Sequence, residues 1–242
     1  MSEPVFDKYE RKGAYHWKEM ERSLVRRNAV LSARYQFILR NLPPSPKRVL
    51  DIGCGDGYLS CKMAEIGHFV HGCDTSETGL QWARTMADRM ALNGRTEFLH
   101  MGPYETGLDA ESFELVVLAD VLEHVMDPGR LLQEARRVLT ADGLLLLSTP
   151  AAVEGHRWDA CHVQEYSRRD LEEVLSSVFT SVQVEELQIH FFFRTYVFRI
   201  LGFSPFRVLI NAMDLAGVNP FFISRRFLPI SVAGQLYAAC RR

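Results

Sequence analysis

Residues 49–57 read VLDIGCGDG, and this stretch decides the fold. An apolar strand ends in a turn whose glycines, Gly53, Gly55 and Gly57, stand at alternate positions, and a helical pattern follows. Glycines let such a turn bring bare backbone against a ligand. Dinucleotide-binding turns instead read G-x-G-x-x-G and place a diphosphate at the helix N-terminus. Because Asp51 would repel a diphosphate, this turn favours a ligand with a positively charged amino group.

Apolar strands and helices alternate outward from this turn. Largely apolar runs such as 113–119 and 144–147 suit strands of a sheet that is covered on both faces. Alternation of this kind gives parallel strands joined by crossover helices, so the sequence predicts an α/β fold with a doubly wound, mostly parallel sheet. The expected strands are 48–52, 68–73, 96–100, 113–119, 144–147, 181–189 and 235–240, and the expected helices are 58–66, 76–92, 127–139 and 168–179.

Two further segments flank the predicted sheet. A helical pattern covers 15–42 and stops at the prolines that follow it. Residues 190–229 contain short aromatic helical patterns that are interrupted by glycine and proline. The predicted organisation is a helical arm at 1–44, an α/β core at 45–190, a helical insertion packed over the site at 191–230, and the last core strand at 231–242.

Composition excludes some partners. The 28 basic and 30 acidic residues of the 242-residue chain give a net charge of −2, so we expect no nucleic-acid partner.

The five cysteines have no zinc-ligand spacing and no CxxC pair, which predicts free thiols in a reducing, cytoplasmic setting. The start of the chain has no signal-peptide pattern. Aromatic residues near 190–230 alternate with arginines. This pattern is typical of a solvated helix face, and it also allows contact with the anionic headgroups of a membrane surface or with a phosphate of the acceptor; the arginines are Arg194, Arg199, Arg207, Arg225 and Arg226.

A second acid stands at the expected distance from the glycine turn. Asp74 ends the second predicted strand, 23 residues after Asp51, where an acid can accept hydrogen bonds from both hydroxyls of a ribose. Four stretches now resemble the successive motifs of class I S-adenosylmethionine (SAM)-dependent methyltransferases: VLDIGCGDG, GCD at 72–74, ADVLEH at 119–124 and RVLTADGLLLLSTP at 137–150. The resemblance covers about residues 45–150. It implies a Rossmann-like, seven-stranded sheet with a final antiparallel strand, a SAM-binding core, and an insertion that caps the acceptor.

The resemblance also implies roles for individual residues. Asp51 and the glycines would hold the methionine end of SAM, Asp74 the ribose, and Ala119 with Asp120 would border the sulfonium. Many relatives carry an Asp after the third strand for the adenine amino group, whereas residues 102–105 here read GPYE. Backbone atoms near Gly102 or the side chain of Glu105 are then the expected adenine contacts. The predicted cofactor-binding residues are Asp51, Gly53, Cys54, Gly55, Asp74, Thr75, Gly102, Ala119 and Asp120.

Residues after the fourth and fifth predicted strands are candidates for the chemistry. A neutral imidazole at His124 or His162 can act as the general base that takes the acceptor's proton. The same region offers a set of divalent-metal ligands, Asp120, Glu123, His124 and His162. This D-x-x-E-H set with a later His resembles the E-x-x-E-H…H arrangement of ubiquinone-pathway O-methyltransferases and small-RNA 2′-O-methyltransferases. In a third interpretation Glu123 and His124 only orient their loop by hydrogen bonds.

The leading hypothesis is O-methylation of a small, partly apolar or aromatic acceptor by SAM. The apolar insertion, with aromatic residues such as Tyr196, would build the acceptor pocket, whereas Trp158 is more typical of a core residue. Alternatives are N- or C-methylation of a small metabolite or glycan, and a catalytically silent SAM-binding module. A nicotinamide-dependent oxidoreductase is disfavoured because its third glycine should stand one residue later.

Overall fold

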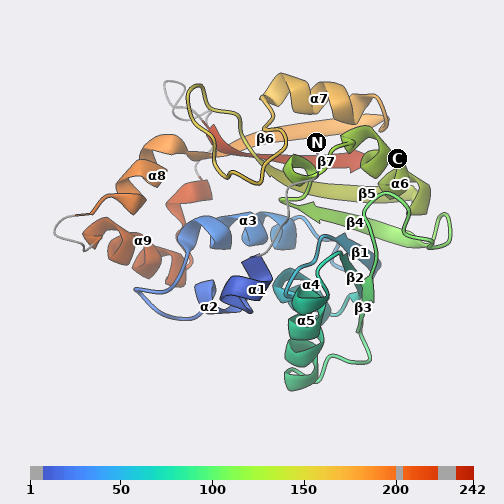
Figure 1. The fold of residues 1–242 in the computed structure, drawn as a ribbon, viewed down its shortest axis with the longest axis horizontal. Coiled ribbons are helices and arrows are strands. Elements are labelled where there is room, and N and C mark those ends of the chain that lie inside the picture. Colours follow the sequence, from blue (N-terminus) through green and yellow to red (C-terminus); the bar gives the residue numbers. More distant parts are fainter. Residues whose placement is uncertain (1–7, 200–203, 223–232) are drawn as a thin grey trace.

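A seven-stranded sheet forms the centre of the protein (Figure 1). The computed structural model describes residues 8–199, 204–222 and 233–242. The sheet order is β3-β2-β1-β4-β5-β7-β6, and β7 runs antiparallel to both of its neighbours while all other neighbouring pairs are parallel. The strands are β1 (Arg48–Ile52), β2 (Phe69–Asp74), β3 (Thr96–His100), β4 (Phe113–Ala119), β5 (Leu139–Pro150), β6 (Ser181–Ile189) and β7 (Ala233–Arg241). The expected α/β sheet with one antiparallel strand near its end is therefore present.

Helices cover both faces of this sheet, because most of its strands present apolar side chains on both sides. One buried cluster joins the sheet to α6 and α7 through residues such as Leu131 and Leu171, and a second joins it to α3, α4 and α5 through residues such as Ile38 and Leu80. These helices are α3 (Ala29–Arg40), α4 (Tyr58–Glu65), α5 (Glu77–Arg89), α6 (Pro128–Val138) and α7 (Arg168–Ser176). The two clusters fix the carboxyl ends of β1, β2, β4 and β5 at one edge.

The N-terminal arm differs from the single helix predicted over 15–42. It consists of α1 (Lys8–Lys12), α2 (Tyr15–Glu19) and α3. The side chain of Asn28 accepts hydrogen bonds from the backbone N–H groups of Val30 and Leu31, each at 3.2 Å, and so starts a new helix at Ala29. The expectation of one continuous helix was wrong because this N-cap interrupts it.

The insertion packs against the arm rather than standing apart. It contains α8 (His190–Val197), α9 (Pro205–Leu215) and the short 3₁₀ helix η2 (Pro220–Phe222). The buried carboxylate of Asp214 accepts hydrogen bonds from Arg27, from Ser32 at 3.1 Å, from Gln36 at 3.1 Å and from Asn219 at 2.8 Å. Three of these four donors belong to the arm, so the insertion and α3 share one polar core.

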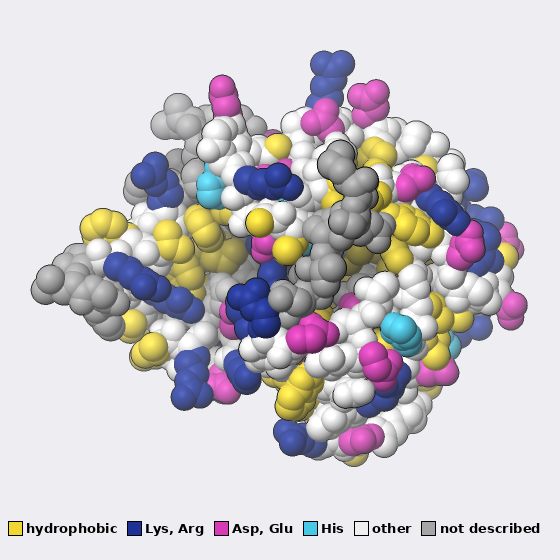
Figure 2. Space-filling model, in the orientation of Figure 1, with side chains coloured by type: hydrophobic (Ala, Val, Ile, Leu, Met, Phe, Trp, Pro, Cys, Tyr) yellow, Lys and Arg dark blue, Asp and Glu magenta, His cyan; other side chains and the backbone are white. Residues whose placement is uncertain are grey.

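Two further expectations concern thiols and membranes. All five cysteines lie in the described part of the chain and are free thiols. Among residues 8–199, 204–222 and 233–242, none of the helices has the length and apolar content needed to span a membrane. Exposed apolar side chains of α8, of the residue after it and of α9 alternate with basic ones at one end of the molecule, on the left in Figure 2; Val197, Phe198, Phe206 and Leu209 are among the apolar residues. Arg225 and Arg226 lie outside the described residues.

Candidate active site

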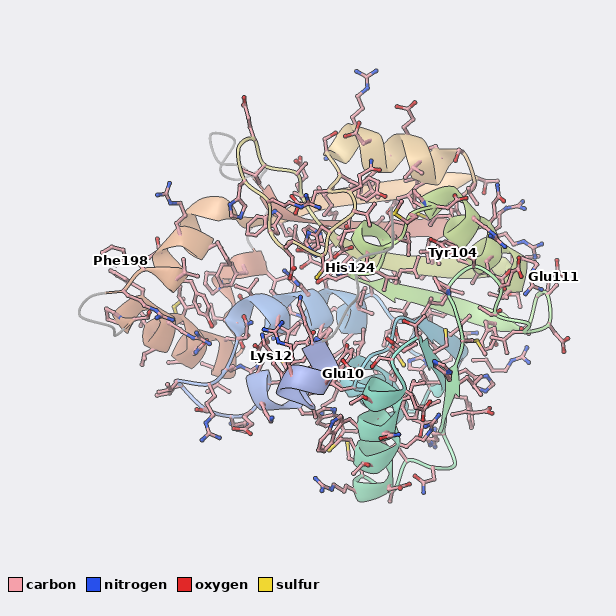
Figure 3. The ribbon with its side chains drawn as sticks, in the orientation of Figure 1. Glu10, Lys12, Tyr104, Glu111, His124 and Phe198 are labelled. Atoms are coloured by element: carbon pink, nitrogen blue, oxygen red, sulfur yellow. The ribbon has the colours of Figure 1, made fainter. Side chains whose placement is uncertain are left out.

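A large cavity of about 1200 Å³ lies at the carboxyl edge of the sheet. Gly53 after β1, Asp74 at the end of β2, Ala119 at the end of β4 and Pro150 at the end of β5 all line it. His124 lies near the middle of the molecule, between the sheet and the N-terminal helices (Figure 3). The cavity is large enough for a nucleoside-sized cofactor together with a small second molecule.

The glycine turn is shaped by close neighbours as well as by its backbone. Gly53 has φ 75° and Gly55 has φ 55°, in the left-handed region that side chains disfavour. A Cβ atom at Gly53 would stand 2.5 Å from Val121 Cγ2, and one at Gly55 would stand 1.7 Å from the hydroxyl of Tyr9. The two glycines therefore let the arm and the segment after β4 approach the turn.

Asp51 lies beneath this turn and lines the cavity although it is almost completely buried. One of its carboxylate oxygens, Oδ2, accepts a hydrogen bond of 2.5 Å from Ser60 Oγ. Burial raises the pKa of Asp51 to about 7. A positively charged amino group placed beside it would favour the ionised carboxylate, as predicted for the methionine end of SAM.

Asp74 is fixed at the end of β2 by backbone donors. Its two oxygens accept hydrogen bonds of 2.8 Å from the N–H groups of Gly55 and Ser76. Burial raises the pKa of Asp74, while these hydrogen bonds oppose that shift. Its neighbour Thr75 also lines the cavity, as does Cys54 in the glycine turn.

Asp56 ties the arm to the glycine turn, a role that the sequence did not reveal. His16 contacts it through the backbone N–H and through Nδ1, each at 3.0 Å, and Trp17 Nε1 donates to its carbonyl oxygen at 2.8 Å. Asp56 is fully buried. Its position between Gly55 and Gly57 marks it as part of the turn, but this position does not indicate a partner.

Asp120 is held by three side chains from distant parts of the chain. It accepts hydrogen bonds from Arg34, from Ser148 Oγ at 2.9 Å and from Gln235 Nε2 at 2.6 Å, and its own φ is 57°. These donors occupy both of its carboxylate oxygens. Asp120 is not part of the metal-compatible cluster found among the described residues, which contains only Glu123, His124 and His162.

Those three residues lie close together beside the cavity. One potential ligand atom from each lies within 4.8 Å of the others, and the two imidazole rings are 5.0 Å apart. Oε2 of the buried Glu123 accepts a hydrogen bond from Thr149 Oγ1 at 3.0 Å, whereas Oε1 is buried without a hydrogen-bond partner. Burial, reinforced by the charge of Asp120, raises the pKa of Glu123 well above its usual range.

The two histidines are oriented by different acceptors. His124 Nδ1 donates to the carbonyl oxygen of Cys161 at 3.2 Å, and burial lowers the pKa of this imidazole. His162 Nδ1 lies 2.7 Å from Glu165 Oε1, which also accepts the backbone N–H of Trp158 at 2.8 Å. A carbonyl can only accept, so the neutral His124 ring carries its proton on Nδ1 and not on Nε2.

The two residues named as expected adenine contacts do not line the cavity, whereas their neighbours do. Met101, Pro103 and Tyr104 line the cavity, but neither Gly102 nor Glu105 is among its lining residues. The carboxylate of Glu105 is largely exposed and pairs instead with Arg130. The segment after β3 therefore borders the cavity mainly through apolar and aromatic side chains.

Known proteins resemble this chain in sequence. Residues 50–147 match the family model described as a methyltransferase domain. The chain is 38% identical over 106 residues to the ubiquinone biosynthesis O-methyltransferase of Glaesserella parasuis; this match covers 43% of the chain and 45% of that protein. The chain thus spans about half the length of the curated relatives it matches.

Solved structures share the fold at lower identity. A phosphoethanolamine N-methyltransferase of Haemonchus contortus, solved with SAM, aligns with a TM-score of 0.67 at 18% identity over 99% of this chain and 60% of that one. The cyclase SpnF aligns with a TM-score of 0.64 at 18% identity over 88% of this chain and 81% of that one. These likenesses show the fold alone. The family match and the motifs around β1, β2 and β4 identify residues 50–147 as a methyltransferase domain, and the solved structures share its fold.

Proposed function

We propose that this protein transfers the methyl group of SAM to a hydroxyl of a small, partly apolar acceptor. One observation carries the proposal: the cavity beside Asp51 and Asp74 continues without interruption to His124, His162 and aromatic residues of the insertion. A cofactor held at the first end would thus face an acceptor held at the second. The O-methyltransferase relatives support oxygen as the accepting atom.

Four residues would hold SAM in this proposal. Asp51 faces the positive amino group, Asp74 accepts from the ribose, and Gly53 and Gly55 allow backbone contact with the methionine end. SAM, when bound, supplies a methyl group already activated by its sulfonium. The protein's remaining task is to align an acceptor in line with that methyl group and to remove the acceptor's proton.

His162 and His124 are both candidates for removing the acceptor's proton. Glu165 orients His162 and stabilises the imidazolium that forms when the ring accepts a proton, as a carboxylate does behind a general-base histidine. His124 remains neutral at lower pH than an exposed histidine because burial lowers its pKa. Either ring can serve as the general base in this proposal. Separate substitution of each histidine tests which one takes the acceptor's proton.

A divalent metal is the second candidate route to an activated acceptor. The unpartnered Oε1 of Glu123, together with His124 and His162, fits the mixed oxygen and nitrogen set that such ions accept. Asp120 does not fit this set, because three donors already bind it. We therefore reduce the proposed ligand set from four residues to three. A bound ion would lower the pKa of an acceptor hydroxyl.

Calorimetric titration with SAM and with S-adenosylhomocysteine (SAH) tests the cofactor site first. Micromolar binding of both is expected. Transfer of labelled methyl to a panel of phenols, catechols, amines and glycosides then tests the preference for hydroxyl oxygen. The panel is repeated with Mg²⁺, Mn²⁺ or Zn²⁺ and after chelation, because only the metal route loses activity with a chelator. Binding of SAH without transfer to any acceptor would support a catalytically silent module, and methylation of nitrogen or carbon would favour an N- or C-methyltransferase.

A further inference from the structure

The cationic side chains that line the cavity differ in how their charge is balanced. Lys8 pairs with Asp159 at 2.6 Å, Arg34 pairs with Asp120, and Lys12 is exposed to water. Arg207 also lines the cavity, yet among residues 8–199, 204–222 and 233–242 it has no carboxylate partner. It is thus the partly buried cation of the described cavity wall that has no counter-charge.

Arg207 is nevertheless held in place. It projects from α9 so that its guanidinium lies 5.3 Å from the centre of the Tyr196 ring, and its Nη2 donates to the carbonyl oxygen of Arg27 at 3.3 Å. Tyr196 is itself fixed, because its hydroxyl accepts from the N–H of Ala29 at 3.1 Å and contacts Asn211 Oδ1 at 3.0 Å. The guanidinium therefore has a defined position before any ligand arrives.

One donor of this guanidinium is unused. Arg207 Nε is buried and has no hydrogen-bond partner. A buried polar donor without an acceptor is costly, and a partly buried charge without a counter-charge adds to that cost. An arginine presents its N–H groups as a planar fork that matches the oxygens of a carboxylate or a phosphate. An anionic group that reached the accessible part of this guanidinium from the cavity would supply the missing counter-charge.

Other residues of the cavity wall indicate the chemical character of the rest of such a ligand. Phe193, Tyr196 and Trp158 line the same cavity, and the rings of Trp158 and Phe193 lie 5.1 Å apart. These side chains offer flat apolar surfaces for an aromatic or apolar body. A cationic guanidinium and an aromatic wall thus line the same cavity.

We propose that Arg207 is a specificity-determining residue, and that the acceptor carries a carboxylate or phosphate group, which Arg207 binds, on an aromatic or apolar body. The inference rests on the proposed function, because it places the acceptor in the cavity that also holds SAM. It goes further by naming the chemical class of the acceptor. Neutral molecules of the same shape can accept a hydrogen bond but would leave the charge of Arg207 without a counter-charge.

Ligand binding to the SAH-saturated protein tests this without any need for turnover. The probes are benzoate, phenyl phosphate and the neutral amide benzamide, measured by calorimetry or by ligand-detected NMR. We expect at least one anionic probe to bind at least tenfold more tightly than benzamide. Preference for benzoate identifies a carboxylate site, and preference for phenyl phosphate identifies a phosphate site. Equal binding of all three probes would overturn the proposal.

Substitutions assign the effect to Arg207. Arg207→Gln should abolish the preference for the anion, Arg207→Lys should retain part of it, and the exposed Arg26→Gln, which removes the same charge outside the cavity, should retain all of it. SAH affinity and the unfolding temperature show whether each variant is folded. If Arg207→Gln does not fold, the anion preference of Arg207→Lys is compared with that of the wild-type protein, and a reduced preference supports the assignment to Arg207. An unchanged preference for the anion in folded Arg207→Gln contradicts the assignment to Arg207. Failure of the wild-type protein to bind SAH would instead contradict the proposed function.

Discussion

His16 binds Asp56 twice, through its backbone N–H to Oδ2 and through its ring Nδ1 to Oδ1, each at 3.0 Å. The two residues are 40 positions apart, and Asp56 lies between two glycines of the turn. This pair, with the hydroxyl of Tyr9 seated where a Cβ of Gly55 would be, fastens the arm over the cofactor end of the cavity. The arm is therefore joined directly to the glycine turn, where we propose that the cofactor binds.

Asp56→Ala should loosen the arm. It leaves the N–H of His16 without its acceptor, a loss of about 1–3 kcal/mol for a buried hydrogen-bonding group. We expect SAH affinity to fall about tenfold and trypsin to cleave the arm faster. Calorimetry and limited proteolysis measure the two effects. Asp56→Asn, which keeps one carbonyl oxygen, should be milder, and equal effects of both variants would show that the side-chain oxygens do not hold the arm.

Asp74→Ala should weaken SAM binding by at least about 1 kcal/mol, because it removes charged hydrogen-bond acceptors proposed for the ribose. The change also leaves the N–H groups of Gly55 and Ser76 without acceptors, which should lower the unfolding temperature. Asp142→Ala removes an exposed acid elsewhere and serves as the matched control. Unaltered SAM affinity in Asp74→Ala would refute the placement of the ribose.

SAH affinity should depend on pH through Asp51. Its pKa is about 7 in the folded protein and about 3.9 when unfolded, so between these values the folded state binds more protons. The stability that protonated Asp51 contributes is therefore complete below about pH 4 and is lost as the pH rises through 7. The amino group of SAH favours the ionised form, so binding should tighten from pH 5.5 to 7.5 and release a proton. Calorimetry in two buffers of different ionisation enthalpy counts that proton. Asp51→Asn should abolish the release, and no release in the wild-type protein would contradict the contact.

His124→Ala and His162→Ala should preserve SAH binding while lowering methyl transfer. Loss of a general base commonly costs about 10²–10⁴-fold in rate. Glu165→Gln should reduce transfer less than His162→Ala, because the histidine remains but loses a carboxylate that orients it. Single-turnover rates with SAM and a competent acceptor measure these effects. If both histidine variants retain the wild-type rate, the base is a different group.

The ion pair between Lys8 and Asp159 joins α1 to the segment after β5, and both residues line the cavity. Lys8→Ala should speed the dissociation of SAH several-fold, as measured by stopped-flow fluorescence. The unfolding free energy should change by less than about 1 kcal/mol, because the pair is partly exposed. Lys62→Ala, which breaks an exposed pair with Glu65, is the control and should leave dissociation unchanged. Exchanging the charges at positions 8 and 159 should restore slow release, and failure to do so would show that packing, not charge, controls exit.

The parts of the fold that local patterns determine were predictable from the sequence. The strand and turn at 49–57 and the parallel core follow from apolar periodicity and glycine spacing, which act over a few residues. The start of α3 could also have been predicted, since an Asn before an apolar run, such as Asn28, is typical of a helix N-cap. One continuous helix was instead predicted where two begin.

Contacts between distant residues were not predictable in the same way. Arg34 and Gln235 bind Asp120 across 86 and 115 positions, and nothing near either residue indicates the partner. These bonds occupy the carboxylate that the motif offered as a metal ligand. The roles assigned to the cofactor-binding residues and to the two histidines remain predictions that the proposed experiments address.

The polar core around Asp214 limits how the acceptor preference of this enzyme can be re-engineered. Arg27, Ser32 and Gln36 supply donors from the arm to a carboxylate that α9 contributes. A chimera that received only a foreign insertion would bury those donors against an unmatched surface. Grafts should accordingly exchange 27–36 and 190–222 as one unit, and libraries for new acceptors should vary the cavity wall while leaving this shared core intact.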